Sequence, residues 1–140
     1  FSQAMARHGL KPLRDLIVST AAFTEIEGER AMLRLREHNS AFTAVVAAND
    51  MIALGCYAAL RGGGLRCPGD VSITGFNDMP FVDRLTPPLT TIRIQHGEMG
   101  RAAAQLILDE IGRPGQPKQD IKLKPSLVVR GSTARPRRAG

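Results

Sequence analysis

The sequence predicts an α/β fold, a parallel sheet with crossover helices on both faces. First, the spacing of apolar residues alternates along the chain between short β-branched runs and longer stretches of helical period. Second, the continuous apolar run over 43–48 is typical of a strand covered on both faces. Third, in the stretch VSITGFNDMPFVDRLTPPLTT over 71–91, a β-branched run breaks at Gly75 and short polar side chains follow.

The first third of the chain is expected to hold two helices with a short strand between them. Apolar residues at helical spacing over 1–8 predict the first helix, and Gly9 suits its C-terminus. Residues 16–18, Leu-Ile-Val, are predicted to be a strand. The second helix begins after Thr24 and runs to about His38. Its apolar stripe consists of Gly28, Ala31, Met32 and Leu35.

The third predicted helix, 51–60, follows the strand 43–48 and is unusual because it contains no charged residue. One face of a sheet cannot cover a helix that is apolar almost all round, so its outer side is expected to meet another subunit or subdomain. The glycines at 62–64 close this helix. They are not read as a phosphate loop, which would precede a helix N-terminus.

The second half of the chain is predicted to complete the sheet. We expect strands at 71–76 and 89–94, a short helical turn at 81–85, a helix with a regular apolar face at 98–111, and a last strand at 127–130 on a sheet edge. Residues 1–133 are read as one domain portion and 134–140 as a disordered basic tail.

Charge and composition argue against several classes of protein. The net charge is +6, but residues 1–112 carry 11 Lys and Arg against 12 Asp and Glu, so the excess lies in the C-terminal stretch. A nucleic-acid-binding surface is therefore not expected on the body of the domain. No apolar run is long enough to span a membrane. The opening at Phe1, without a leader, suggests a cut within a longer protein.

The candidate chemistry is binding and not catalysis. No metal-ligand spacing, nucleophile elbow or phosphate-binding loop is present, so neither an enzyme, a cofactor nor a metal is expected. Polar residues instead follow the ends of strands that should share one sheet edge, where amides and carboxylates suit a polyhydroxylated ligand and an aromatic ring covers its apolar face. The candidate ligand-binding residues are Phe23, Asn49, Asp50, Asn77 and Asp78.

Structural roles for the same residues remain open. Asp50 and Asp78 could be helix N-caps, Asn77 could support a turn, and Phe23 could belong to the core. The cysteines, Cys56 and Cys67, are read as reduced thiols.

Three stretches resemble the effector-binding domain of the LacI/GalR family of bacterial transcription repressors. They are AVVAANDMIALGCYAALRGGGLRCPGDVSITGFNDMPFVDRLTPPLTTIR, then GEMGRAAAQLILDEI, then LVVRGST. The resemblance covers nearly the whole chain to about Thr133. It implies the type I fold of periplasmic binding proteins, with two α/β lobes around a ligand cleft, of which this chain is mainly the C-terminal lobe.

The resemblance also implies site residues and partners. Phe23 matches a residue that often stacks on the ligand, Asn49 one that hydrogen-bonds to it, and Asn77 a position usually held by aspartate. The implied partners are a small-molecule effector, a sugar or nucleoside, and operator DNA through an N-terminal domain that this chain lacks. The helix 98–111 corresponds to a segment that crosses back into the other lobe. The helix 51–60 matches the dimer interface, for which the candidate residues are Met51, Leu54, Tyr57 and Ala58.

The resemblance predicts a cytoplasmic homodimer without a membrane segment. The alternative is a periplasmic sugar-binding protein of a transport system, which would need a signal peptide and would not need an apolar dimer helix. The pattern ND-x-x-A-x-G is shared with sugar-binding periplasmic proteins, whereas P-x-DVS-x-x-GF-x-D followed by PPLTT is typical of the repressors.

Overall fold

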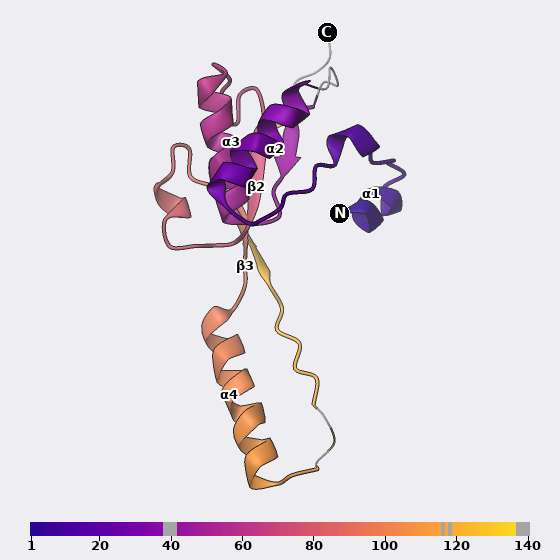
Figure 1. The fold of residues 1–140 in the computed structure, drawn as a ribbon, viewed down its shortest axis with the longest axis vertical. Helices are drawn as coiled ribbons and strands as arrows, with labels where there is room; N and C mark the ends of the chain where they lie inside the picture. Colours follow the sequence, from indigo (N-terminus) through magenta and orange to yellow (C-terminus); the bar gives the residue numbers. More distant parts are fainter. Residues whose placement is uncertain (38–41, 116, 118, 137–140) are drawn as a thin grey trace.

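The computed structural model describes residues 1–37, 42–115, 117 and 119–136, and it has a four-stranded sheet at its centre (Figure 1). The strand order is β1-β2-β3-β4, in which the first three strands run parallel and β4 pairs antiparallel with β3 at an edge. The predicted α/β fold and the edge position of the last strand are therefore confirmed. The strands are β1 (Ala44–Val46), β2 (Ser72–Asn77), β3 (Thr90–Arg93) and β4 (Ser126–Val128).

The helices agree with the sequence prediction to within a few residues at each described end. They are α1 (Ser2–Arg7), α2 (Glu25–Glu37), α3 (Asp50–Gly62) and α4 (His96–Gly112), with single 3₁₀ turns η1 (Arg14–Leu16) and η2 (Val82–Arg84). His38, the predicted end of the second helix, lies outside the described residues.

The predicted strand at 16–18 is wrong. Leu16 ends the 3₁₀ turn η1, and Ile17 after it has an extended backbone but belongs to no sheet. A strand is defined by its hydrogen bonds to a neighbour, and none of the described strands pairs with this segment.

Helix α3 connects β1 to β2 and forms the centre of the core together with α2. The predicted stripe of α2, from Gly28 to Leu35, is buried as expected. The two helices approach closely where Gly28 faces the backbone of Ile52 and Gly55 faces the backbone of Glu25, and a Cβ atom at either glycine would overlap that backbone. Glycine at both positions therefore allows the two helix backbones to come into direct contact.

The sheet is covered by helices on one face only among the described residues. Ile73, Gly75 and Thr91 point toward α3 and are buried. On the opposite face Val46 is 64% exposed, and Phe76, Leu127 and Val129 are exposed as well. The expectation of crossover helices on both faces is thus met on one face. Likewise β1 is not covered on both sides, because Ala44 and Val46 are exposed.

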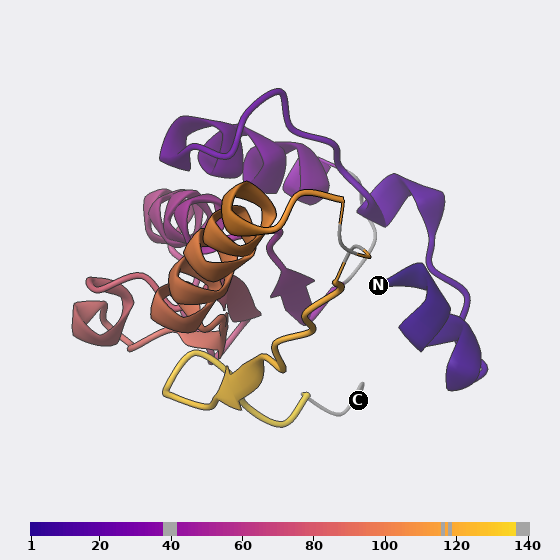
Figure 2. The same ribbon diagram turned by 90° about the horizontal axis from the view of Figure 1, so that it is seen from below.

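Helix α4 and the extended segment that returns from it project away from the body of the molecule (Figure 1), and in the view from below helix α4 lies in front of the body (Figure 2). No residue of α4 is buried, although its sequence has a regular apolar face. Within this projection Ile111 is 72% exposed, and Met99, Ile107 and Leu108 are also exposed. An apolar helix face of this length without a partner indicates an interaction surface.

The segment after β4 is held between β2 and β3. The buried hydroxyl of Ser132 donates to the carbonyl oxygen of Ile73 at 2.6 Å and accepts from the amide of Thr90 at 2.8 Å. The amide of Ala134 donates to Ser72 Oγ at 3.1 Å, so the chain remains attached to the sheet at the first residue of the predicted tail. Residues 137–140 of that tail lie outside the described part of the chain.

Candidate functional site

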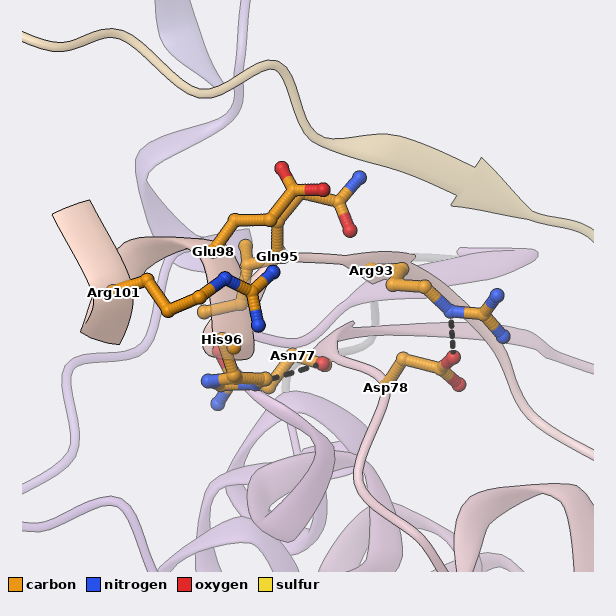
Figure 3. A pocket seen from close by; sticks show the side chains of 9 residues that line it. Asn77, Asp78, Arg93, Gln95, His96, Glu98 and Arg101 are labelled. Carbon is orange, nitrogen blue, oxygen red and sulfur yellow. Dashed lines mark hydrogen bonds and ion pairs between the residues drawn. The ribbon is translucent and has the colours of Figure 1, made fainter.

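An open pocket of about 320 Å³ lies where β2 and β3 end and α4 begins (Figure 3). The pocket is at the carboxyl edge of the parallel strands, where the sequence predicts the ligand-binding residues. It contains two of the five candidates, Asn77 and Asp78. The residues that line it are Asn77, Asp78, Arg93, Ile94, Gln95, His96, Gly97, Glu98 and Arg101.

Asp50 does not line the pocket, because its carboxylate is an internal support. It is fully buried, and its two oxygens accept from Thr91 Oγ1 at 2.6 Å and from the amide of Met79 at 2.8 Å. Gly75 lies directly beneath it, and a Cβ atom there would overlap the carboxylate. The structure thus gives Asp50 the role of joining α3 to β3 and to the loop after β2.

Asn49 is the N-cap of α3, a role that the sequence left open for its neighbour Asp50. Its side-chain oxygen accepts from the amide of Ile52 at 2.9 Å, which satisfies a donor in the first turn of the helix. The amide nitrogen of its side chain is not used in this bond. Phe23 lies two residues before α2 and is 67% exposed, so it is not a core residue among the described parts of the chain.

Asp78 is held by two arginines. Its Oδ2 accepts from Arg93 Nε at 2.6 Å and its Oδ1 accepts from Arg130 Nη2 at 2.6 Å. Burial would raise the pKa of this carboxyl group, but the two guanidinium groups outweigh burial and hold the pKa below its usual value of 3.8. Asp78 is not a helix cap, and both of its oxygens are already engaged.

Asn77 and Asp78 have an unusual backbone, with φ angles of 114° and 58°. Positive φ is uncommon for residues other than glycine and is tolerated best by asparagine and aspartate. The carbonyl oxygen of Asn77 lies 3.3 Å from His96 Nε2. Because a carbonyl oxygen can only accept, this contact needs the proton on Nε2. Among the described residues the side chain of Asn77 has no hydrogen-bond partner, and it faces the pocket (Figure 3).

The remaining polar side chains of the pocket come from the start of α4 and were missed by the sequence reading. Figure 3 shows the Arg101 guanidinium above His96 and Asn77, with Glu98 and Gln95 nearby. Gln95 Nε2 donates to the carbonyl oxygen of Lys124 at 3.5 Å. The rule that strand ends share an edge would also have selected residues 94–98, because this segment follows β3 directly.

The predicted interface helix α3 has an outer stripe that is only partly covered. Met51, Leu54 and Ala58 are half-buried and lie three or four residues apart. Tyr57 does not belong to this stripe. It is 5% exposed, and its hydroxyl donates to the carbonyl oxygen of Pro87 at 2.9 Å, so it supports the loop before β3.

The pocket offers amide and guanidinium donors next to one exposed carboxylate, which suits hydrogen bonding to a small polar molecule. Within the described ranges no cluster of three or more His, Cys, Asp or Glu side chains could hold a metal ion. None of the described helices is long and apolar enough to cross a membrane.

Comparison with known proteins gives a consistent result. The family model of the periplasmic binding protein-like domain matches residues 1–133. The regulator MalR of Streptomyces coelicolor is 50% identical over 92 residues, which are 66% of this chain and 27% of that protein. The ribose operon repressor of Escherichia coli is 35% identical over 132 residues, 94% of this chain and 40% of that protein.

A solved structure has the same fold as this chain. A LacI-family regulator from Enterococcus faecium with bound ribose has a TM-score of 0.85 and 32% identity, covering 96% of this chain and 49% of that one. The chain therefore spans less than half the length of these relatives. It belongs to the periplasmic binding protein-like domain family, in the form found in LacI-family transcriptional regulators.

Proposed function

We propose that this chain is the C-terminal part of the effector-binding domain of a DNA-binding transcriptional regulator, and that its effector is a sugar or a nucleoside. The observation that carries the proposal is the pocket at the ends of β2 and β3, which offers, at the edge of a parallel sheet, the side chain of Asn77 without a partner among the described residues. The named relatives are regulators, which favours this function over that of a transport receptor.

The proposed contacts to the effector are made by Asn77, Asn49 and Phe23. The side chain of Asn77 offers both a donor and an acceptor, which suits a pair of hydroxyl groups. Asn49 keeps its amide nitrogen available while its oxygen caps α3. The exposed ring of Phe23 would cover the apolar face of a sugar or base. We assign no direct contact with the effector to Asp50 or Asp78, because the oxygens of each carboxylate already accept hydrogen bonds from other residues of the protein.

The test is effector binding by the full-length protein, with ribose as the first probe and a nucleoside as the second. Asn77→Ala and Phe23→Ala should each weaken binding by about 1–3 kcal/mol, from a lost hydrogen bond or lost stacking, and leave operator affinity unchanged. Gln105→Ala and Leu33→Ala are the matched controls, because both residues are exposed on helices outside the pocket. Unchanged effector response in both Asn77→Ala and Phe23→Ala would remove these residues from the site.

The second part of the proposal concerns the surfaces that this chain leaves open. We assign the half-buried stripe of Met51, Leu54 and Ala58 on α3 to contact with a second copy of the chain, and the exposed apolar face of α4 to the other lobe. Leu54→Glu should convert a full-length dimer into a monomer in sedimentation, whereas Leu33→Glu on α2 should not. A dimer that persists in Leu54→Glu would contradict the assignment of α3.

A further inference from the structure

One side chain, that of Asp78, connects three separate parts of the chain beside the pocket. Its two oxygens bind Arg93 and Arg130, each at 2.6 Å. Arg130 in turn donates from Nη1 to the carbonyl oxygen of Leu89 at 2.8 Å. The side chains of Asp78 and Arg130 are only 7% and 15% exposed, so this ion pair is largely shielded from solvent and salt, whereas the side chain of Arg93 is 52% exposed. We refer to Asp78, Arg93 and Arg130 as the carboxylate clamp.

Arg93 lies where the chain leaves the sheet, and Arg130 lies just after β4, the strand with which the chain returns to the sheet. Arg93 is the last residue of β3, three positions before α4 begins. Arg130 follows β4, after the extended segment has returned from the projection (Figure 1). Gln95 and Lys124 add one hydrogen bond between the outgoing and the returning segment. The clamp therefore joins the end of β3 to the segment that follows β4, and these are the two strands from which the projection with α4 extends.

The third part of the clamp is the turn that carries Asn77. Asn77 and Asp78 both have positive φ, a conformation that persists only where the surroundings hold it. Two buried or nearly buried carboxylates hold this turn, because Asp50 binds the amide of Met79 on one side and Asp78 binds the arginines on the other. The position of Asn77 in the pocket thus depends on both carboxylates.

We propose that Asp78 is a positioning residue, which fixes Asn77, the end of β3 and the segment that follows β4 as one unit. A ligand that shifts Asn77 would then also shift the base of α4. Ligand binding would thereby change the position of the exposed apolar face of α4. This inference rests on the proposed function for the identity of the ligand, but the clamp itself is a property of the free protein.

The first experiment uses no ligand and measures amide hydrogen exchange in the full-length protein. In Asp78→Asn the amides over 94–99 and 126–130 should exchange about tenfold faster than in the wild type, while those of α2 and α3 keep their rates. Asp83→Asn is the matched control, an exposed aspartate on the neighbouring turn η2. Wild-type exchange in both of the segments 94–99 and 126–130 would overturn the proposal. So would an equal increase in α2 and α3, since that indicates a general loss of stability.

The second experiment titrates ribose into the full-length protein and its variants. Asp78→Asn and Arg130→Gln should each weaken ribose binding by about fivefold or more, and the double variant should be no weaker than either single one. Additive losses would show that the two residues act separately and would overturn the clamp. If the wild type binds no ribose, ribose is excluded as the effector, and the exchange experiment alone decides about Asp78.

Discussion

The internal role of Asp50 gives a sharp prediction about stability. Replacement by alanine removes the acceptor of two hydrogen bonds, from Thr91 Oγ1 at 2.6 Å and from the Met79 amide at 2.8 Å. A hydrogen bond to a charged group contributes about 1.5–3 kcal/mol, and neither donor finds water at a site with no solvent exposure. Asp50→Ala should therefore lower the free energy of unfolding by about 3–5 kcal/mol, a large part of an ordinary total.

Asp50→Asn should cost much less, because the Thr91 hydroxyl can rotate and accept from the new amide nitrogen. The amide oxygen then still accepts from Met79, and only the contribution of the charge is lost, about 1–2 kcal/mol. In Asp50→Asn with Thr91→Val that rescue is impossible, because valine cannot accept. The double variant should therefore be clearly less stable than Asp50→Asn alone.

The assay is urea unfolding of the full-length protein, followed by circular dichroism. Asp83→Asn serves as the control, because this aspartate is exposed and its replacement should change stability by less than about 0.5 kcal/mol. An unchanged stability of Asp50→Ala would refute the internal role. If Asp50→Asn were as unstable as Asp50→Ala, the proposed reversal of the Thr91 hydrogen bond would be wrong.

Three further predictions concern packing, pH and thiol reactivity. Gly55→Ala should destabilise the protein by more than about 2 kcal/mol in the same unfolding assay, because its Cβ overlaps the Glu25 backbone, while Gly100→Ala in α4 meets no atom and should stabilise it by up to about 1 kcal/mol. The pKa of Asp78 is lowered on folding, so its stabilisation is present above pH 3.8 and is lost as the pH falls through the lowered value. Asp78→Asn should accordingly lose less stability than the wild type between about pH 5 and pH 2. An equal loss in both proteins would show that protonation of Asp78 does not cause the loss of stability at low pH. Burial raises the pKa of Cys56 to about 12, so Cys56→Ser should leave the rate of fast thiol modification in the native protein unchanged; a slower rate would show that Cys56 is accessible.

Local patterns in the sequence were enough to predict most helices and the edge of the sheet that carries the pocket. The stripe from Gly28 to Leu35 was predictable because helical periodicity is a property of consecutive residues. The placement of Asn49 and Asn77 at one edge followed from the alternation of strands and helices, since β1 and β2 must then run parallel.

Only the tertiary structure decided which polar residue serves which purpose. Asn49 and Asp50 are adjacent and both good caps, and the choice between them depends on Gly75 and Thr91, which come from other strands. The pairing of Asp78 with Arg130 joins residues 52 positions apart, so no local pattern could reveal it. The failed strand at 16–18 has the same cause, because a strand needs a neighbour that its own residues do not specify. Short-range periodicity thus determined the elements of this protein, whereas long-range contacts determined which side chains remain free to bind.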